Sequence, residues 1–204
     1  METKPTRYAF IDVQNTEGTV KLLGFIVDWH KLHHSLKEQW NCEKIFFYSG
    51  IDQGNDDKID EHLALKKLGY EMSIKPYKIY KNHDKTVKII CPKCANEIDY
   101  KIEGGVRWKS NCDTELSVDA TNLAKPGVEF LIFSGDGDFE YVIRNAVDKG
   151  VKVYVVSSAK KMKVALRYSV SRFSIKLREL IAEKKDSVFY VDIDLWKLKI
   201  KKDI

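Results

Sequence analysis

The stretch Tyr8-Ala-Phe-Ile-Asp-Val13 is a short apolar run that carries a single carboxylate, Asp12. Its length and composition are typical of a buried strand in a parallel sheet. Five more strand-like runs follow, at residues 44–49, 70–75, 129–134, 151–156 and 187–191. Helical patterns lie between most of them. This alternation predicts an α/β fold of three layers, with a mainly parallel sheet and helices on both faces.

The bulk composition is that of an ordinary globular protein. The chain has 204 residues, 44% of them hydrophobic and 32% charged, which fits one domain over residues 1–204. Lys and Arg number 35 against 30 Asp and Glu, and a net charge of +5 is too mild to identify a nucleic-acid partner. No run approaches the roughly 20 apolar residues that span a bilayer. We therefore expect a cytoplasmic protein without a membrane partner, whose cysteines are mostly reduced.

Residues 77–105 break the alternation of strands and helices. Short β-like runs flank Cys91-Pro-Lys-Cys94, which predicts a β-hairpin insertion. The spacing of Cys91 and Cys94 is that of half a Zn²⁺ site, and Cys112 and His83 are candidates for the missing ligands. Three readings stay open: an intramolecular zinc site, a zinc ion shared between the subunits of a homodimer, and plain β structure.

Four carboxylates are expected at one edge of the sheet. Asp12 ends the first strand, Asp136 and Asp138 follow the strand at 129–134, and Asp113 opens a helix. The carboxyl ends of parallel strands meet at a common rim, where ligands bind. Crowded carboxylates raise one another's pKa, and a hard cation such as Mg²⁺ or Mn²⁺ relieves that repulsion.

Three of the four acidic residues also have a structural explanation. Asp138 is a suitable helix N-cap, Asp113 is favoured at a helix start, and Asp136 suits a turn between glycines. Asp12 is harder to explain in this way, because it ends a buried apolar strand where no turn chemistry is needed. The placement of all four on one edge therefore favours a metal site. Asp119 lies roughly 9 Å further along its helix than Asp113 and ranks below them.

Three motifs resemble those of a known family. Phe10-Ile-Asp-Val-Gln-Asn15, Lys109-Ser-Asn-Cys-Asp113 and Ser134-Gly-Asp-Gly-Asp-Phe139 are similar, in order and spacing, to motifs of NYN domains. These form the LabA-like branch of the PIN-like nucleases, and the resemblance covers roughly residues 8–156. It implies a PIN-like fold and cleavage of RNA with Mg²⁺ or Mn²⁺.

The resemblance also implies roles for individual residues. Asp12, Asp113 and Asp136 would bind metal, Asp138 would assist, and Asn15 would orient the first carboxylate or contact the substrate. Gly137 departs from the pattern, since serine is more usual at that position, and we expect the loop to be looser as a result.

The C-terminal part, residues 160–204, is basic, and we expect it to be helical from about Met162 to Glu183. Its cations, together with the first residue of the second motif and the two residues before that motif, are candidates for binding single-stranded RNA through phosphates and a stacked base. The site candidates among them are Arg107, Trp108, Lys109, Arg167 and Arg172.

The leading hypothesis is a metal-dependent endoribonuclease. A non-catalytic RNA-binding or regulatory module and a small-substrate phosphohydrolase are the alternatives, and the basic C-terminal part argues against the second of these.

Overall fold

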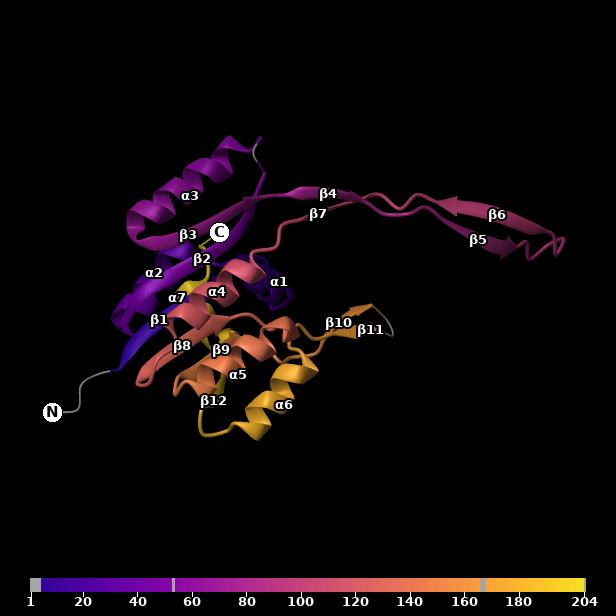
Figure 1. Ribbon diagram of the computed structural model, residues 1–204. Helices are drawn as coiled ribbons and strands as arrows, with labels where there is room; N and C mark the ends of the chain where they lie inside the picture. The colour runs from indigo at the N-terminus through magenta and orange to yellow at the C-terminus, as the bar shows by residue number, and fades with distance from the viewer. Residues whose placement is uncertain (1–4, 53, 166–167, 204) are drawn as a thin grey trace.

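The computed structural model describes residues 5–52, 54–165 and 168–203. Its central strands are β1 (Thr6–Asp12), β2 (Cys42–Ile51), β3 (Tyr70–Pro76), β8 (Val128–Phe133), β9 (Lys152–Ser157) and β12 (Val188–Asp192). They form one six-stranded sheet in the order β12-β9-β8-β1-β2-β3, and every neighbouring pair runs parallel (Figure 1). The predicted α/β class with a parallel sheet is confirmed.

Helices cover both faces of this sheet. One face carries α4 (Asp113–Leu123), α5 (Glu140–Asp148) and α6 (Ile175–Glu183). The other carries α1 (Val13–Leu22), α2 (Trp29–Glu38), α3 (Asp56–Leu68) and the short α7 (Lys197–Ile200), which follows a 3-10 turn at Ile193–Trp196. Side chains of β1 alternate between the layers, as strand geometry requires: Phe10 packs with the first group and Ile11 with the second.

Local capping explains where most helices begin. Asp28 caps α2, Asn55 caps α3, and Gly69 ends α3 in a left-handed conformation with φ of 115°. Sequence patterning missed α1 and instead extended the first strand to Val13. That helix starts directly at the end of β1 and has no strong apolar period, so only its cap marks it.

Residues 78–109, which we call the arm, project from the α/β body (Figure 1). Its base pairs β4 (Lys78–Lys81) with β7 (Val106–Lys109), and its outer part pairs β5 (Lys85–Ile90) with β6 (Glu97–Ile102), both antiparallel. A hairpin was predicted, although the pairing continues four residues past the expected end at 105.

The expected helix from Met162 is wrong over its first half. Met162–Ala165 and Tyr168–Val170 form the antiparallel strands β10 and β11, and α6 begins only at Ile175, capped by Ser174. Tyr-Ser-Val alternates apolar and polar residues, which suits a strand better than a helix. Among the described residues, no helix is long and apolar enough to cross a bilayer.

Candidate functional site

The topology of the sheet places one crevice at its carboxyl edge. From β1 the chain moves outward through β2 to β3, and from β8 it moves the opposite way through β9 to β12. The direction therefore reverses between β1 and β8, which is where ligands bind in open α/β sheets. Asp12 ends β1 at this point, and the Ser134–Asp138 loop follows β8 beside it.

Asp12 is held by hydrogen bonds from two segments. Its Oδ1 accepts the backbone N–H of Asn15 at 3.1 Å, and its Oδ2 accepts the hydroxyl of Ser134 at 3.0 Å. The first contact makes Asp12 the N-cap of α1. The expectation that the end of this strand needs no turn chemistry is wrong, because a helix begins there, so this carboxylate has a structural role as well as a place in the crevice.

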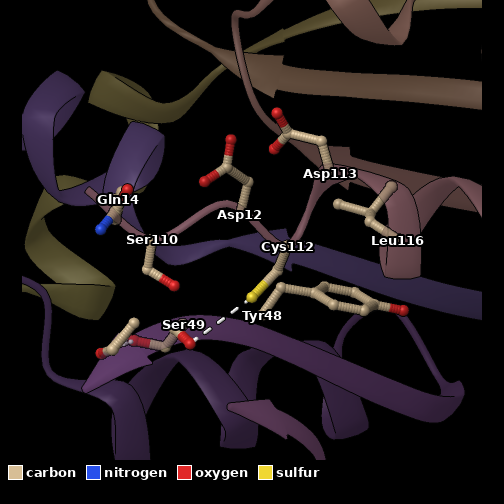
Figure 2. Close-up of a pocket in the computed structure, with 9 residues that line it drawn as sticks. Asp12, Gln14, Tyr48, Ser49, Ser110, Cys112, Asp113 and Leu116 are labelled. Atoms are coloured by element: carbon tan, nitrogen blue, oxygen red, sulfur yellow. Dashed lines mark hydrogen bonds between the residues drawn. The ribbon is translucent and has the colours of Figure 1, made fainter. Parts of the chain in front are cut away.

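The Asp12 carboxylate is destabilised as an anion. Burial raises its pKa from 3.8 to about 6, repulsion from Asp113 and Asp136 adds to the rise, and the hydrogen bonds from Asn15 and Ser134 oppose it. Figure 2 shows the carboxylates of Asp12 and Asp113 on the same side of the pocket that they line. That pocket measures about 20 Å³, room for roughly one water molecule.

The third motif is ordered by its own side chains. The Ser134 hydroxyl accepts the backbone N–H of Asp136 at 3.1 Å, and Asp136 Oδ1 accepts that of Asp138 at 3.0 Å. Asp136 therefore caps the 3-10 turn Gly137–Phe139, and the expectation that Asp138 is the cap is wrong. Asp138 is exposed and does not cap this turn.

This loop is also fastened to its neighbours. Asn15 Oδ1 accepts the N–H of Gly135 at 2.9 Å, and the Gly135 carbonyl accepts the N–H of Ser174 at 2.9 Å. A Cβ atom at Gly137 would lie 2.3 Å from Ser174 Oγ, so a glycine is what allows this close approach. The expectation that Gly137 loosens the loop is wrong, because the loop is packed against the start of α6.

The donor set suits a hard cation, although the ligands are not gathered around one. Asp12, Asp113 and Asp136 offer only carboxylate oxygens, and their mutual repulsion is what a divalent cation would relieve. Within the described ranges, however, no three His, Cys, Asp or Glu side chains are close enough to enclose an ion. Binding would have to draw these carboxylates together, and the shared cation stays a prediction.

Two further acids of α4 are occupied elsewhere. Glu115 forms an ion pair with Lys75 at 2.6 Å, and that lysine lowers the pKa of the Glu115 carboxyl. Asp119 accepts the hydroxyl of Tyr48 at 2.8 Å. Asp113 is thus the acidic residue of this helix that lines the crevice.

The basic residues that were candidates for binding RNA differ in whether the structure describes their side chains and in what those side chains contact. Arg167 lies outside the described residues, and so do the side chains of Arg107, Trp108 and Lys109. The Arg172 guanidinium lies against Gly18 of α1, and the Lys176 side chain lies against Gly137 of the acidic loop. Two other cations of the basic C-terminal part have partners: Lys160 pairs with Asp194, and Arg178 donates to the Ala159 carbonyl.

A groove that the sequence did not reveal leads away from the crevice. It lies between α4 and α5, has a volume of about 600 Å³, and begins at Asp113 and Asp138. Tyr141 lines it with 76% of its surface exposed, and the buried Oδ1 of Asn145 has no hydrogen-bond partner among the described residues. An exposed tyrosine in a helix has no sequence signature, so patterning could not have found this surface.

Comparisons with known proteins agree with this architecture. The model of the NYN domain family matches residues 8–178. Low amplitude and bright protein LabA of Synechococcus elongatus is 26% identical over 178 residues, 85% of each chain. The crystal structure of VPA0982 from Vibrio parahaemolyticus, a protein of unknown function, has a TM-score of 0.61 at 19% identity, over 95% of this chain and 97% of that one. The Vibrio protein shares the fold.

Proposed function

This chain belongs to the NYN domain family, and on that premise we propose that it is a metal-dependent endoribonuclease. The family and the LabA relative support a nuclease-type, hydrolytic activity. Within the molecule, the observation that carries the proposal is the Asp12 carboxylate, which burial and two neighbouring acids disfavour as an anion. Such a group at a topological switch point is well suited to bind a cation.

We assign the metal to Asp12, Asp113 and Asp136, with Asp138 assisting. A bound Mg²⁺ or Mn²⁺ would lower the pKa of a water molecule and neutralise charge that develops on the scissile phosphate. The chain itself supplies orientation: Ser134 and the backbone of Asn15 hold the Asp12 carboxylate, so its direction is set before any ligand arrives. The Asn15 side chain, by holding Gly135, keeps the third motif beside it.

The surroundings of the crevice favour an RNA strand as substrate. The α4–α5 groove has a volume of about 600 Å³, and the exposed ring of Tyr141 that lines it could stack on a nucleobase. Lys176 and Arg172 provide positive charge beside the acidic loop and α1, where phosphates would otherwise meet only carboxylates. We further treat residues 160–204 as part of the same domain, because β12 completes the central sheet, and residues 77–105 as an insertion.

A cleavage assay tests the proposal. Purified protein is incubated with labelled single-stranded RNA and Mg²⁺ or Mn²⁺, with Asp12→Asn as the site variant and Asp99→Asn, an exposed acid of the arm, as its matched control. We expect Asp12→Asn to lose at least about 100-fold in rate, because it removes a metal ligand, and Asp99→Asn to keep full activity. Cleavage that survives Asp12→Asn, or that needs no metal, would overturn the assignment.

Binding measurements separate the enzyme from its non-catalytic alternative. Lys176→Ala should weaken RNA affinity and flatten its salt dependence by about 0.7 in log–log slope, since one phosphate contact is lost. Lys185→Ala, beyond the other end of α6, should change neither. RNA binding that shows this pattern without any cleavage would favour the regulatory module, and absence of both would favour the small-substrate phosphohydrolase.

A further inference from the structure

The outer part of the arm has one apolar and one polar face. Directly opposed residues of an antiparallel pair point to the same side of the ribbon. Val87 is opposite Tyr100 and Ile89 is opposite Ile98, whereas the pairs on the other side include Lys88 with Asp99. The apolar stripe, defined by five side chains that are 38–57% exposed, consists of Val87, Ile89, Ile98, Tyr100 and Ile102. In the part of the chain that the structure describes, no layer covers it.

The two cysteines lie at the tip of this ribbon in a tight turn. The Cys91 N–H donates to the Asn96 carbonyl at 3.0 Å, and the Cys91 carbonyl accepts the N–H of Ala95 at 2.9 Å. The backbone N–H groups of Lys93 and Cys94 also contact the Cys91 sulfur. Cys91 directly follows Ile90, the last residue of β5, so both cysteines stand at the outer end of the ribbon that carries the apolar stripe.

The chain cannot complete a metal site at this tip by itself. Cys112 is buried in the body, where its sulfur contacts the carbonyls of Ser49 and Ser73, and Cys42 is buried in β2. His83 precedes β5, whose six residues separate it from the tip by roughly 20 Å. Among the described residues, no third ligand stands near the pair. Structural zinc sites are tetrahedral, so two ligands are missing.

We propose that the arm is a dimerisation device, in which Cys91 and Cys94 of two copies of this chain together bind one zinc ion. A second copy supplies the same pair of thiolates, which gives the four sulfur ligands that zinc accepts. The contact is self-complementary, as a two-fold interface requires: stripe meets stripe while the two tips share the metal. Burial of the stripe removes apolar surface from water, and the zinc ion fixes the register of the two arms.

The test measures metal content and mass on the full chain. Protein purified without chelator should hold 0.5 zinc per chain and sediment as a dimer, and removal of zinc with EDTA should give monomer. Cobalt that replaces zinc should show the absorption of a tetrahedral thiolate site. Cys91→Ser and Cys94→Ser should each abolish the metal and the dimer, whereas Lys93→Ala, within the same turn, should leave both unchanged.

A second pair of variants tests the stripe without touching the ligands. Ile98→Thr keeps a β-branched residue but removes apolar surface, and we expect the dimer dissociation constant to rise about tenfold. Ile90→Thr is the matched control, since Ile90 is 63% exposed but lies on the polar face. It should leave the constant unchanged.

Several results would overturn the proposal. They are a monomer that retains one zinc per chain, a dimer that ignores both EDTA and Cys91→Ser, and protein that binds neither zinc nor cobalt. Equal effects of Ile98→Thr and Ile90→Thr would also contradict the docked stripe. Asp12→Asn should still form the zinc dimer, so a failure here is distinguishable from a failure of the nuclease assignment.

Discussion

Strands β8 and β5 each contain six residues, yet their surroundings are opposite. Every residue of β8 is buried, and every residue of β5 is exposed. β8 is hydrogen-bonded on both edges and covered on both faces, whereas β5 has one partner strand and bare faces. Because an isolated two-stranded hairpin is at best marginally stable in water, the body is held by its own core and the arm depends on what it docks against.

Truncation of an aromatic core residue should have the largest effect. Phe130 is fully buried and meets Phe10 edge to face at 4.9 Å. Phe130→Ala should lower the free energy of unfolding by about 3–5 kcal/mol. The same measurement on Ile98→Ala, in EDTA to keep the chain monomeric, should give a change within about 0.5 kcal/mol. Urea unfolding followed by tryptophan fluorescence measures both, and a large loss from Ile98→Ala would mean that the arm packs on its own body.

Replacing Asp12 by asparagine should have the next largest effect, and it should raise the free energy of unfolding rather than lower it. The pKa of the Asp12 carboxyl is about 6 in the folded protein against 3.8 ordinarily, so the folded state resists ionisation. The resulting loss of folding stability is absent below pH 4, grows as the pH rises from 4 to 6, and reaches about 3 kcal/mol above pH 6. Asp12→Asn keeps a capping oxygen and should therefore stabilise the protein at pH 7 by up to about this amount.

The pH dependence of that gain is the check. The difference in unfolding free energy between Asp12→Asn and the unchanged chain should shrink steadily as the pH falls from 7 to 4.5. Mg²⁺ or Mn²⁺ should stabilise the unchanged chain and not the variant. In the arm, Asp99→Asn should show neither behaviour. A difference in unfolding free energy that does not vary with pH would mean that Asp12 ionises normally.

Ion pairs offer a matched comparison of the two regions. Arg7 and Glu129 pair at 2.6 Å in the body, with only 11% of the Glu129 side chain exposed, and Lys88 and Glu97 pair at 2.9 Å in the arm, where that glutamate is 58% exposed. Glu129→Gln should cost about 1–3 kcal/mol because it leaves a partly buried guanidinium without its anion. Glu97→Gln should cost at most about 0.5 kcal/mol. Comparable costs from urea titrations would contradict this contrast.

The smallest effect concerns two tyrosine hydroxyls. Tyr48 donates to Asp119 from within the body, and Tyr100 stands on the exposed stripe. Tyr48→Phe should lower the free energy of unfolding by about 1 kcal/mol, while Tyr100→Phe should leave it unchanged. Thermal unfolding resolves the difference, and a silent Tyr48→Phe would show that water replaces the lost donor.

The body was predictable because its signals are local and repeated. The apolar strands, Asp28, Asn55 and Gly69 each mark an element by its own chemistry, and the rule for parallel sheets then brings Asp12 and the 134–138 loop to one edge. The position of that edge follows from topology, which short apolar strands indicate well.

The remaining features depend on contacts between distant residues. Ser174 donates a backbone hydrogen bond to Gly135 and lies against Gly137, which joins the start of α6 to the acidic loop. No local pattern predicts these contacts. The start of α1 was missed because Asp12 serves at once as strand end and helix cap. The groove beside Tyr141 forms only when α4 and α5 pack side by side.

The central place of β1 also shapes how the chain folds during its synthesis. Ile11 pairs with Phe133, so one edge of the first strand stays open until β8 has left the ribosome. At roughly 5–20 residues per second, that wait is on the order of ten seconds, and the arm lengthens it because it is translated in between. An open edge of a buried apolar strand can pair with other chains. The nascent protein therefore has a period in which chaperones that shield strand edges would protect it, and this period ends when β8 has left the ribosome.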